Sequence, residues 1–384
     1  MLALDDRPIR YFNEAMSAAT LEDTLIDKVL SGDRITPDDA RALYRFPLVE
    51  LGELANRRRN LIKRDSYDGR GEDVVTYIID RNINYTNVCN VYCKFCAFYR
   101  TEKDHDHYVL SLEELDRKLD ELSAIDGVQI LLQGGHHPKL GIDWYLTMLS
   151  HMREKYPHIN IHGFSPPEFN HFAEVFGMSL REVITKFKEA GLGSIPGGGG
   201  EILVDRVRNR IAPLKCDSDH WLKVMEIAHE LGLKSSATMM FGHVETVDDR
   251  IEHLERLRVQ QDATGGFTAF ICWTFQPGTP GAPGSPKLRA EPVGSGEYLR
   301  MQALSRIYLD NIENLQSSWV TQGPKIGQIA LKYGANDFGS VMMEENVVSA
   351  AGTSFRLAKQ QIEDLIRDAG YEARRRDNWY RLLD

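Results

Sequence analysis

The chain has 384 residues, of which 42% are hydrophobic and 27% are charged. This is the composition of a globular protein with a substantial core, and the length suits one α/β barrel with an added terminal segment. The formal net charge is −10, which argues against nucleic acid or an anionic membrane as the main partner.

Targeting signals are not evident. The opening residues, 1–6, have no basic start and no apolar core, so they predict no signal peptide. No apolar stretch is long enough to span a bilayer. Three of the five cysteines fall between residues 89 and 96, which does not suggest a secreted disulfide framework. We therefore expect a soluble, cytoplasmic protein.

The N-terminal part is predicted to be helical. Thr36 can cap a helix, Pro37 suits its first position, and Asp38 and Asp39 favour the positive end of its dipole. A charged, glycine-containing stretch, 63–73, then leads to the first apolar run. We expect residues 1–73 to form a helical extension packed on the domain that follows, 74–384.

From residue 74 onward, short apolar runs alternate with longer amphipathic segments. Strands are predicted at 74–79, 128–132, 159–164, 193–196, 235–241, 268–275, 317–320 and 337–342. Helices are predicted between them at 112–122, 143–156, 180–190, 219–231 and 247–260. Eight strands that alternate with helices predict a (β/α)8 barrel of the TIM type, with a C-terminal segment after it.

A cysteine motif follows the first predicted strand. Cys89, Cys93 and Cys96 have C-x3-C-x2-C spacing on a loop at the C-terminal mouth of the barrel, where such folds keep their chemistry. Thiolates are soft ligands suited to iron–sulfur clusters, and electron-transfer clusters normally take four of them. Three thiols on a four-iron cluster leave one iron open, which predicts that a ligand binds there.

The three cysteines also allow two other interpretations, a structural zinc site and a redox pair. A structural zinc site needs a fourth ligand, which His105 or His107 offers. A redox C-x-x-C pair would leave Cys89 without a role. Cys216 and Cys272 are interpreted as buried small apolar residues.

Polar and glycine-rich strings follow the later strands. The strings begin at Gln133, Gly163, Gly197, Met239 and Trp273. Each lies at the C-terminal end of a predicted strand, so their polar side chains should converge over one mouth. Four consecutive glycines, Gly197–Gly200, exceed the needs of a turn, and we interpret them as a loop whose backbone approaches a ligand.

The cysteine loop, which is followed by the aromatic Phe98 and Tyr99, resembles that of the radical S-adenosylmethionine (SAM) superfamily. The resemblance implies a [4Fe–4S] cluster whose open iron chelates the amino and carboxylate groups of SAM. One electron then breaks a carbon–sulfur bond and releases a 5′-deoxyadenosyl radical, which abstracts hydrogen from a substrate.

The later strings resemble a narrower group, from about residue 80 to the C-terminus. This group contains the dehypoxanthine futalosine cyclases of menaquinone biosynthesis, the aminofutalosine synthases and the deazaflavin-cofactor synthases. The resemblance to the cyclases implies hydrogen abstraction at the ribose C4′ of dehypoxanthine futalosine and closure onto its aromatic ring. It also implies a small-molecule substrate and an electron donor such as flavodoxin or ferredoxin.

The resemblance carries residue roles onto this sequence. Gly134 and Gly135 would approach SAM, Tyr99 would contact it through its backbone, and Glu201 would hold its ribose hydroxyls. Arg206 would pair with a carboxylate of SAM or substrate, or else be a surface arginine. One departure stands out, because many members have Gly-Gly-Glu where this chain has Gly134-Gly135-His136.

Ring closure also requires a base for the aromatic proton. Glu168 and His136 are the candidates, although Glu168 could instead cap a helix and His136 could orient a loop. Substrate-binding candidates are Gln133, Ser165, His243 and Trp273. Phe275 is expected to share the strand face of Trp273, and core packing is an alternative for both. Weaker candidates are Thr321, Gln322 and Asn336.

Two alternative functions remain open. One is a sister enzyme, either an aminofutalosine synthase or a deazaflavin-cofactor synthase. The other is a non-catalytic iron–sulfur or zinc protein, which would need four protein ligands.

Overall fold

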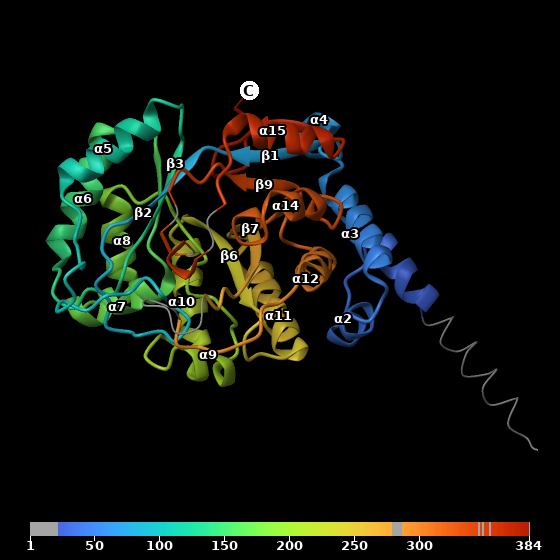
Figure 1. The fold of residues 1–384 in the computed structure, drawn as a ribbon, viewed down its shortest axis with the longest axis horizontal. Coiled ribbons are helices and arrows are strands. Elements are labelled where there is room, and N and C mark those ends of the chain that lie inside the picture. The colour runs from blue at the N-terminus through green and yellow to red at the C-terminus, as the bar shows by residue number, and fades with distance from the viewer. Residues whose placement is uncertain (1–21, 279–285, 345, 348, 353–354, 384) are drawn as a thin grey trace, which may run out of the picture.

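The strands of the structure, a computed structural model, form one parallel sheet that curls around a central axis (Figure 1). The structure describes all residues except 1–21, 279–285, 345, 348, 353–354 and 384, so the opening residues of the signal-peptide prediction lie outside the described part. The strand order is β10-β1-β9-β8-β7-β6-β5-β4-β3-β2. The strands are β1 (Val74–Ile78), β2 (Asp80–Asn84), β3 (Gln129–Gln133), β4 (Asn160–Gly163), β5 (Ser194–Ile195), β6 (Lys234–Phe241), β7 (Phe267–Thr274), β8 (Asn314–Gln316), β9 (Asp337–Ser340) and β10 (Glu372–Arg375).

Two consecutive strands, β1 and β2, bring the ends of the sheet together. β1 pairs with β9, whereas β2 pairs with β3, and only Ile79 separates β1 from β2. The carbonyl of Ile78 accepts a hydrogen bond from Val341, and that of Ile79 accepts one from Val128. The sheet therefore curls back on itself through one continuous segment, as the predicted α/β barrel requires.

Helices cover the outside of the sheet (Figure 1). They are α2 (Pro37–Leu43), α3 (Leu48–Lys63), α4 (Ser66–Gly69), α5 (Leu112–Ser123), α6 (Ile142–Lys155), α7 (Pro166–Phe176), α8 (Leu180–Ala190), α9 (Asp205–Ile211), α10 (Ser218–Glu230), α11 (Val247–Thr264), α12 (Ser295–Tyr308), α13 (Trp319–Gln322), α14 (Pro324–Ala330) and α15 (Lys359–Asp368), with the 3-10 turn Ser349–Ala351. Capping boxes begin α2, α5, α8 and α11, since each N-cap hydroxyl accepts from the backbone N–H three residues on and the acid at that position accepts from the N-cap N–H. No helix among the residues described has the length and apolar character needed to cross a membrane.

Most predicted strands are confirmed, and one is wrong. The run 317–320 is not a strand, because β8 ends at Gln316 and helix α13 starts at Trp319. The apolar character of this run serves helix packing, since Trp319 is 1% exposed and its indole N–H donates to the carbonyl of Ser340. The edge strand β10 was not predicted, and α7 was anticipated only as the helix that Glu168 could cap.

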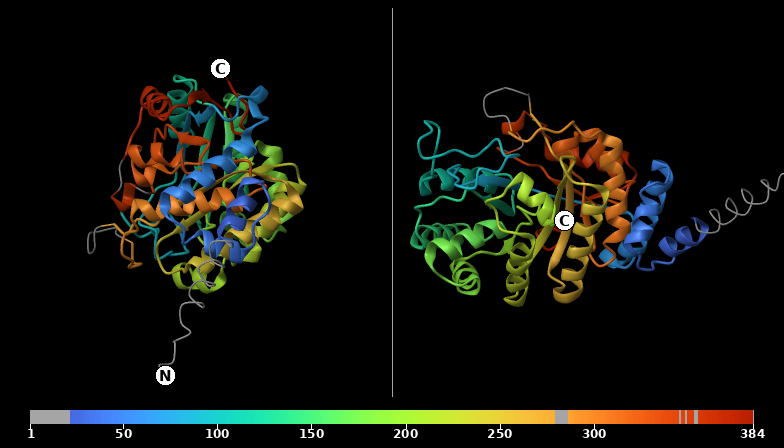
Figure 2. Two further views of the ribbon diagram at one scale, coloured as in Figure 1. Left: turned by 90° about the vertical axis from the view of Figure 1, so that its right-hand side faces the viewer. Right: turned by 90° about the horizontal axis from the view of Figure 1, so that it is seen from below.

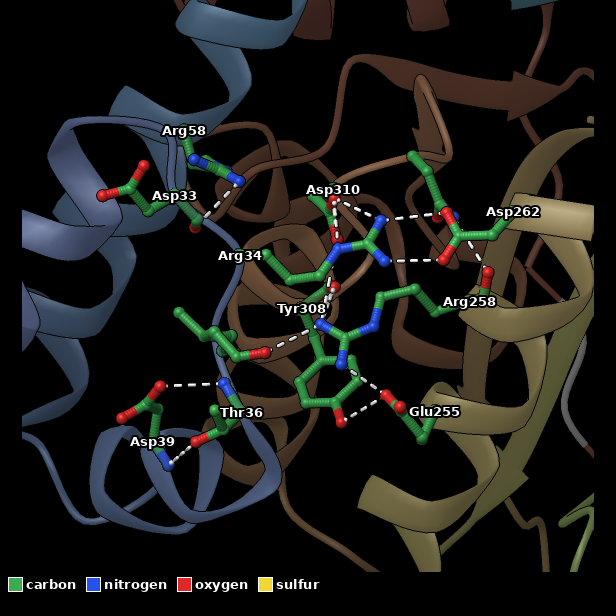
Figure 3. A network of polar contacts seen from close by, with 12 residues as sticks. Asp33, Arg34, Thr36, Asp39, Arg58, Glu255, Arg258, Asp262, Tyr308 and Asp310 are labelled. Carbon is green, nitrogen blue, oxygen red and sulfur yellow. Dashed lines mark hydrogen bonds and ion pairs between the residues drawn. The ribbon is translucent and has the colours of Figure 1, made fainter.

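The N-terminal helices pack on one side of the barrel, α3 against α12 and α2 against α11 (Figure 2). A polar network links the segment before α2 to the barrel helices (Figure 3). Arg34 donates to both carboxylate oxygens of Asp262 at 2.6 and 2.9 Å and to Asp310 at 2.8 and 3.0 Å. One guanidinium therefore joins the extension to α11 and to the residues after α12.

Replacing Arg34 by alanine is expected to lower the free energy of unfolding by about 1 kcal/mol, because this bidentate pair is partly exposed. Urea unfolding at low and high salt measures it, and the deficit should shrink as salt screens the lost charges. The control is Arg57→Ala, which removes one exposed pair with Glu53 inside α3 and should cost about half as much or less. Equal deficits for both variants would contradict the bridging role of Arg34.

The C-terminal segment turns inward after β10. Arg376 is 4% exposed, and its Nε and Nη2 donate to the two oxygens of Asp337 at 2.5 and 3.0 Å. Asn378 donates to Ser194 Oγ at 3.0 Å. This segment therefore supplies polar side chains to the interior of the sheet.

Candidate active site

The cysteine loop follows β2, and its backbone is tied down on both sides. The N–H of Cys89 donates to the carbonyl of Arg100 at 2.9 Å, and the N–H of Lys94 donates to that of Ile211 at 2.8 Å. Tyr92, between the first two cysteines, has a φ of 52°, so the chain reverses sharply there. The loop is thus held in one conformation by neighbours from two other segments.

Arg100 fixes the end of this loop. Its Nη1 donates to the carbonyls of Ala97, Phe98 and Tyr99 at 3.2, 3.3 and 3.0 Å, while its Nε pairs with Asp106 at 2.7 Å. Three carbonyls that converge on one guanidinium force the chain to curl around it. Arg100 was not predicted as a site residue, because an arginine four residues after the last cysteine carries no pattern of its own.

The thiol groups lie in a desolvated setting. Cys93 is 8% exposed, and burial raises the pKa of its thiol to about 12. Burial also raises the pKa of the Cys96 thiol, although the backbone N–H groups of Phe98 and Tyr99 point at its sulfur and oppose the shift. Backbone N–H groups directed at sulfur are a feature that tunes iron–sulfur clusters, so the loop fits such a group.

The zinc alternative gains no support from the geometry. Within the described part of the chain, no three His, Cys, Asp or Glu side chains are grouped closely enough to hold one metal ion. His105 and His107 are exposed, and the Nδ1 of His107 contacts the carbonyl of Asp104 at 2.6 Å. A single ion needs donors about 2.0–2.3 Å from one point.

The glycine pair after β3 makes room for the cysteine loop. A Cβ on Gly135 would overlap the carbonyl oxygen of Val88 and lie 2.9 Å from the Cβ of Cys89. A Cβ on Gly134 would lie 2.5 Å from the ring of Tyr85. The N–H of Gly135 donates to Thr86 at 2.9 Å. Close packing alone therefore accounts for both glycines, and contact with SAM stays a prediction.

Gly135→Ala is expected to reduce the iron content of the reconstituted protein several-fold, because the added methyl group pushes the loop away from β3. Iron analysis after anaerobic reconstitution measures it. The control is Gly141→Ala, since a Cβ there has open space around it. Normal iron loading of Gly135→Ala would show that the loop does not depend on this contact.

The glycine run 197–200 is held by two side chains from outside it. Nη1 of Arg208 donates to the carbonyls of Gly199 and Gly200 at 3.1 and 2.9 Å, and Nε and Nη2 donate to the carbonyl of Cys216. The indole of Trp221 donates to Gly198 at 3.1 Å. Arg208 was missed, although its helical spacing from the apolar Val204 and Ile211 places it on the apolar side of α9, unlike Arg206.

Glu201 lies at the end of this run and meets two cations. Lys215 Nζ donates to its Oε1 at 2.8 Å, and Arg208 Nη1 lies 3.6 Å from Oε2. Glu201 is 7% exposed and has a φ of 33°, an unusual conformation for a residue other than glycine. Lys215 also lies 5.1 Å from the ring centre of Phe95 in the cysteine loop. A buried carboxylate is thus fixed beside the loop.

A cavity of about 400 Å³ opens below the cysteine loop, inside the sheet. Its lining includes several of the residues that the sequence predicted for the site. They are Gln133, Cys96, Glu201, Trp273 and Phe275, together with Gly197, Gly198, Gly199 and the weaker candidate Thr321. The neighbouring Thr274 lines the cavity as well. The structure therefore brings the cluster loop, the glycine run and the aromatic strand end together over one space.

Other predicted residues lie away from this lining. Arg206 is exposed and pairs with Asp249 on α11, which favours its surface interpretation. The His243 ring lies 2.9 Å from Glu245 Oε2 and 3.0 Å from the carbonyl of Met240. Tyr99 receives a hydrogen bond from Lys287 at 2.8 Å through its hydroxyl.

Glu168 is fully engaged by protein donors. The Ser165 N–H and hydroxyl donate to its Oε2 at 2.7 Å each, while the Tyr85 hydroxyl and the Gly134 N–H donate to Oε1 at 2.8 and 3.0 Å. Burial still raises its pKa. Ser165 and Glu168 form the capping box of α7, which is the alternative that the sequence left open.

His136, the second predicted base, packs against His171 at 4.9 Å between ring centres. Burial, followed by the charges of His171 and Lys215, holds its pKa well below the ordinary value. The weaker candidates Gln322 and Asn336 bond to protein groups, Gln322 to Thr274 at 2.7 Å and Asn336 to Arg306 at 2.6 Å.

Comparisons with known proteins agree with this geometry. Residues 83–257 match the radical SAM superfamily, and residues 264–384 match the CofH/MqnC C-terminal region. The chain is 42% identical over 94% of its length to cyclic dehypoxanthine futalosine synthase of Halalkalibacterium halodurans, covering 95% of that protein. It is 44% identical over 94% of its length to the synthase of the same name from Streptomyces coelicolor, covering 88% of that protein.

This chain is a radical SAM enzyme of the CofH/MqnC family. Enzymes of the superfamily use a [4Fe–4S] cluster and SAM, as predicted. The chain is also 39% identical to 5-amino-6-(D-ribitylamino)uracil–L-tyrosine 4-hydroxyphenyl transferase of Methanococcoides burtonii. The match covers 91% of this chain and 96% of that protein. Its fold is similar to methylornithine synthase, with a TM-score of 0.68 at 17% identity, over 91% of this chain and 97% of that one.

Residues in the cavity that the sequence analysis missed lie on strand interiors. Asp80 and Asn82 alternate on β2, and His162 follows on β4. Polar residues at every second position of a buried strand are the signal for an inward polar face. The predicted strand 74–79 ends before Asp80 and Asn82, whereas His162 lies inside the predicted strand 159–164 but was not among the candidates.

Proposed function

We propose that this radical SAM enzyme converts dehypoxanthine futalosine to cyclic dehypoxanthine futalosine in menaquinone biosynthesis. The observation that carries the proposal is the 42–44% identity to two synthases of that name over 94% of the chain. It is supported by the cavity, which lies directly below the cysteine loop and has both an aromatic and a polar lining. A substrate with a sugar and an aromatic ring needs both.

We propose that Cys89, Cys93 and Cys96 hold the cluster, with one iron open for SAM. When bound, the cluster and SAM would supply the 5′-deoxyadenosyl radical that abstracts hydrogen. Gly134, Gly135 and the backbone of Tyr99 are the proposed SAM contacts on the loop side. Glu201 is proposed to accept hydrogen bonds from the SAM ribose, and Lys215 and Arg208 hold its carboxylate in place.

The cavity lining performs the remaining tasks. Trp273 and Phe275 exclude water around the reacting carbon, and Gln133 offers an amide to a substrate oxygen. The aromatic proton needs an acceptor, for which Glu168 and His136 remain the proposed residues. Neither is among the described residues that line the cavity, and Glu168 would act through the Tyr85 hydroxyl that donates to it.

Further proposals concern the partners. The net charge of −10 supports the absence of a nucleic-acid partner. An electron donor such as flavodoxin or ferredoxin is proposed because the reaction starts with a single electron. A cytoplasmic location follows from the metabolic role and stays a proposal.

A product assay tests the function. The cluster is reconstituted without oxygen, SAM, dithionite and dehypoxanthine futalosine are added, and products are analysed by mass spectrometry. Free 5′-deoxyadenosine with a substrate-derived product lighter by two hydrogens supports the cyclase. Free 5′-deoxyadenosine with unchanged substrate would move the assignment to a sister enzyme. No SAM cleavage by a fully loaded cluster would contradict both.

A further inference from the structure

Two buried polar side chains face the cavity at one level of the sheet. Asn82 on β2 pairs in register with Leu131 on β3, which pairs with His162 on β4. Asn82 is 5% exposed and His162 is 7% exposed, and both line the cavity. The glycine run is in contact with this level, because the Ser236 hydroxyl beside His162 accepts from the N–H of Gly197 at 3.1 Å.

The hydrogen bonds of Ser194 fix the tautomer of His162. Ser194 Oγ accepts from the amides of Asn160 and Asn378, each at 3.0 Å. A hydroxyl oxygen has two acceptor positions, so its own proton must go to the third neighbour, His162 Nδ1 at 2.7 Å. The proton of the neutral ring is therefore on Nε2.

His162 is consequently a hydrogen-bond donor toward the cavity. Burial, followed by the charge of Arg376, lowers its pKa to about 3, so the ring is neutral. The nearest protein acceptor of Nε2 is Ser236 Oγ at 3.4 Å, a long contact to an oxygen that already accepts from Gly197. The Nε2–H group can therefore exchange this long contact for a shorter hydrogen bond to a ligand oxygen.

Asn82 has an acceptor atom that lacks a donor. Its side-chain Oδ1 is buried and has no hydrogen-bond partner among the described residues. A buried, unpaired amide oxygen is costly, and such atoms in native proteins commonly meet a ligand or an ordered water. The neighbouring polar residue of β2, Asp80, by contrast accepts from Gln129 at 3.2 Å and from Ser340.

We propose that Asn82 and His162 form a subsite that binds the sugar hydroxyl groups of the substrate. A hydroxyl both donates and accepts, so adjacent hydroxyls can satisfy Asn82 Oδ1 and His162 Nε2–H together. A carboxylate only accepts and would leave Asn82 Oδ1 unpaired, close to the Asp80 carboxyl group. The subsite orients the sugar ring below the glycine run, and this inference rests on the proposed function.

The test uses cluster-loaded enzyme with SAM, dithionite and dehypoxanthine futalosine. Asn82→Leu removes the amide at nearly constant volume, His162→Phe removes the donor, and His162→Gln restores one. The control is Asn209→Leu, at an exposed asparagine of α9. Iron content and the change of the cluster EPR signal on SAM addition establish that each variant is folded and loaded.

Asn82→Leu and His162→Phe are each expected to raise KM for the substrate about tenfold, the effect of one lost hydrogen bond. His162→Gln should recover part of this, and Asn209→Leu should match the unmodified enzyme. Substrate analogues that lack one sugar hydroxyl should bind the unmodified enzyme more weakly, while one of them should bind Asn82→Leu as well as the full substrate does.

Unchanged KM in both loaded variants, or equal penalties for every analogue in the unmodified enzyme and in Asn82→Leu, would overturn the subsite. Failure of the proposed function looks different, because the unmodified enzyme would then not convert the substrate at all. In that case the subsite proposal falls with it.

Discussion

Cys93→Ala is expected to abolish cluster binding, so that the iron content falls from about four atoms per chain to nearly none. The variant retains two thiols of the loop, and two ligands do not hold a four-iron cluster against loss to solvent. Cys89→Ala and Cys96→Ala should behave alike. Iron and sulfide analysis after anaerobic reconstitution, with EPR of the reduced protein, measures the effect.

The other two cysteines provide the controls. Cys216 is half-buried beside Arg208, and Cys272 is fully buried on β7 with its thiol 3.5 Å from Gln302. Cys216→Ala should retain the full iron content, and its cluster should still respond to SAM. Full iron loading of Cys93→Ala would refute the assignment of the loop, and a loss in Cys216→Ala would indicate a fourth protein ligand.

Arg376→Met is expected to destabilise the protein by about 3–5 kcal/mol, the usual consequence of removing one partner of a buried ion pair. Asp337 is completely buried and would keep only Thr76 as a donor, at 2.6 Å, among the contacts described. The C-terminal segment would also lose its anchor inside the sheet. Urea unfolding followed by circular dichroism measures the free energy.

Two further variants separate the charge effect from a general loss of packing. Arg376→Met combined with Asp337→Leu should recover part of the loss, since no unpaired charge then remains buried. Arg367→Met, at an exposed arginine paired with Glu363 on the same helix, should cost less than about 1 kcal/mol. Equal effects of Arg367→Met and Arg376→Met would contradict the anchoring role.

Regular periodicity made most of the barrel predictable. The ends of α8 were predicted to the residue, because Ser179 caps it and its apolar residues recur at helical spacing. The strand predicted at 317–320 is wrong. The true strand, β8, has three residues, too few to show an alternation of apolar and polar positions, and the apolar Trp319 belongs to helix α13. β10 was not predicted, because its sequence, Glu-Ala-Arg-Arg, is polar and shows no pattern typical of a strand.

The sequence by itself determined the chemistry: three thiols at fixed spacing on a loop after a strand, and glycines where the backbone must approach closely. These are local properties, written in neighbouring residues. Only the tertiary structure decided which polar residues face the cavity. Glu168 and His136 lie at the right ends of their strands but engage protein groups, while Asn82 and His162 share one level of the sheet although eighty positions apart. The physical reason is that hydrogen-bond satisfaction depends on neighbours distant in the chain, and these neighbours meet only when the sheet closes.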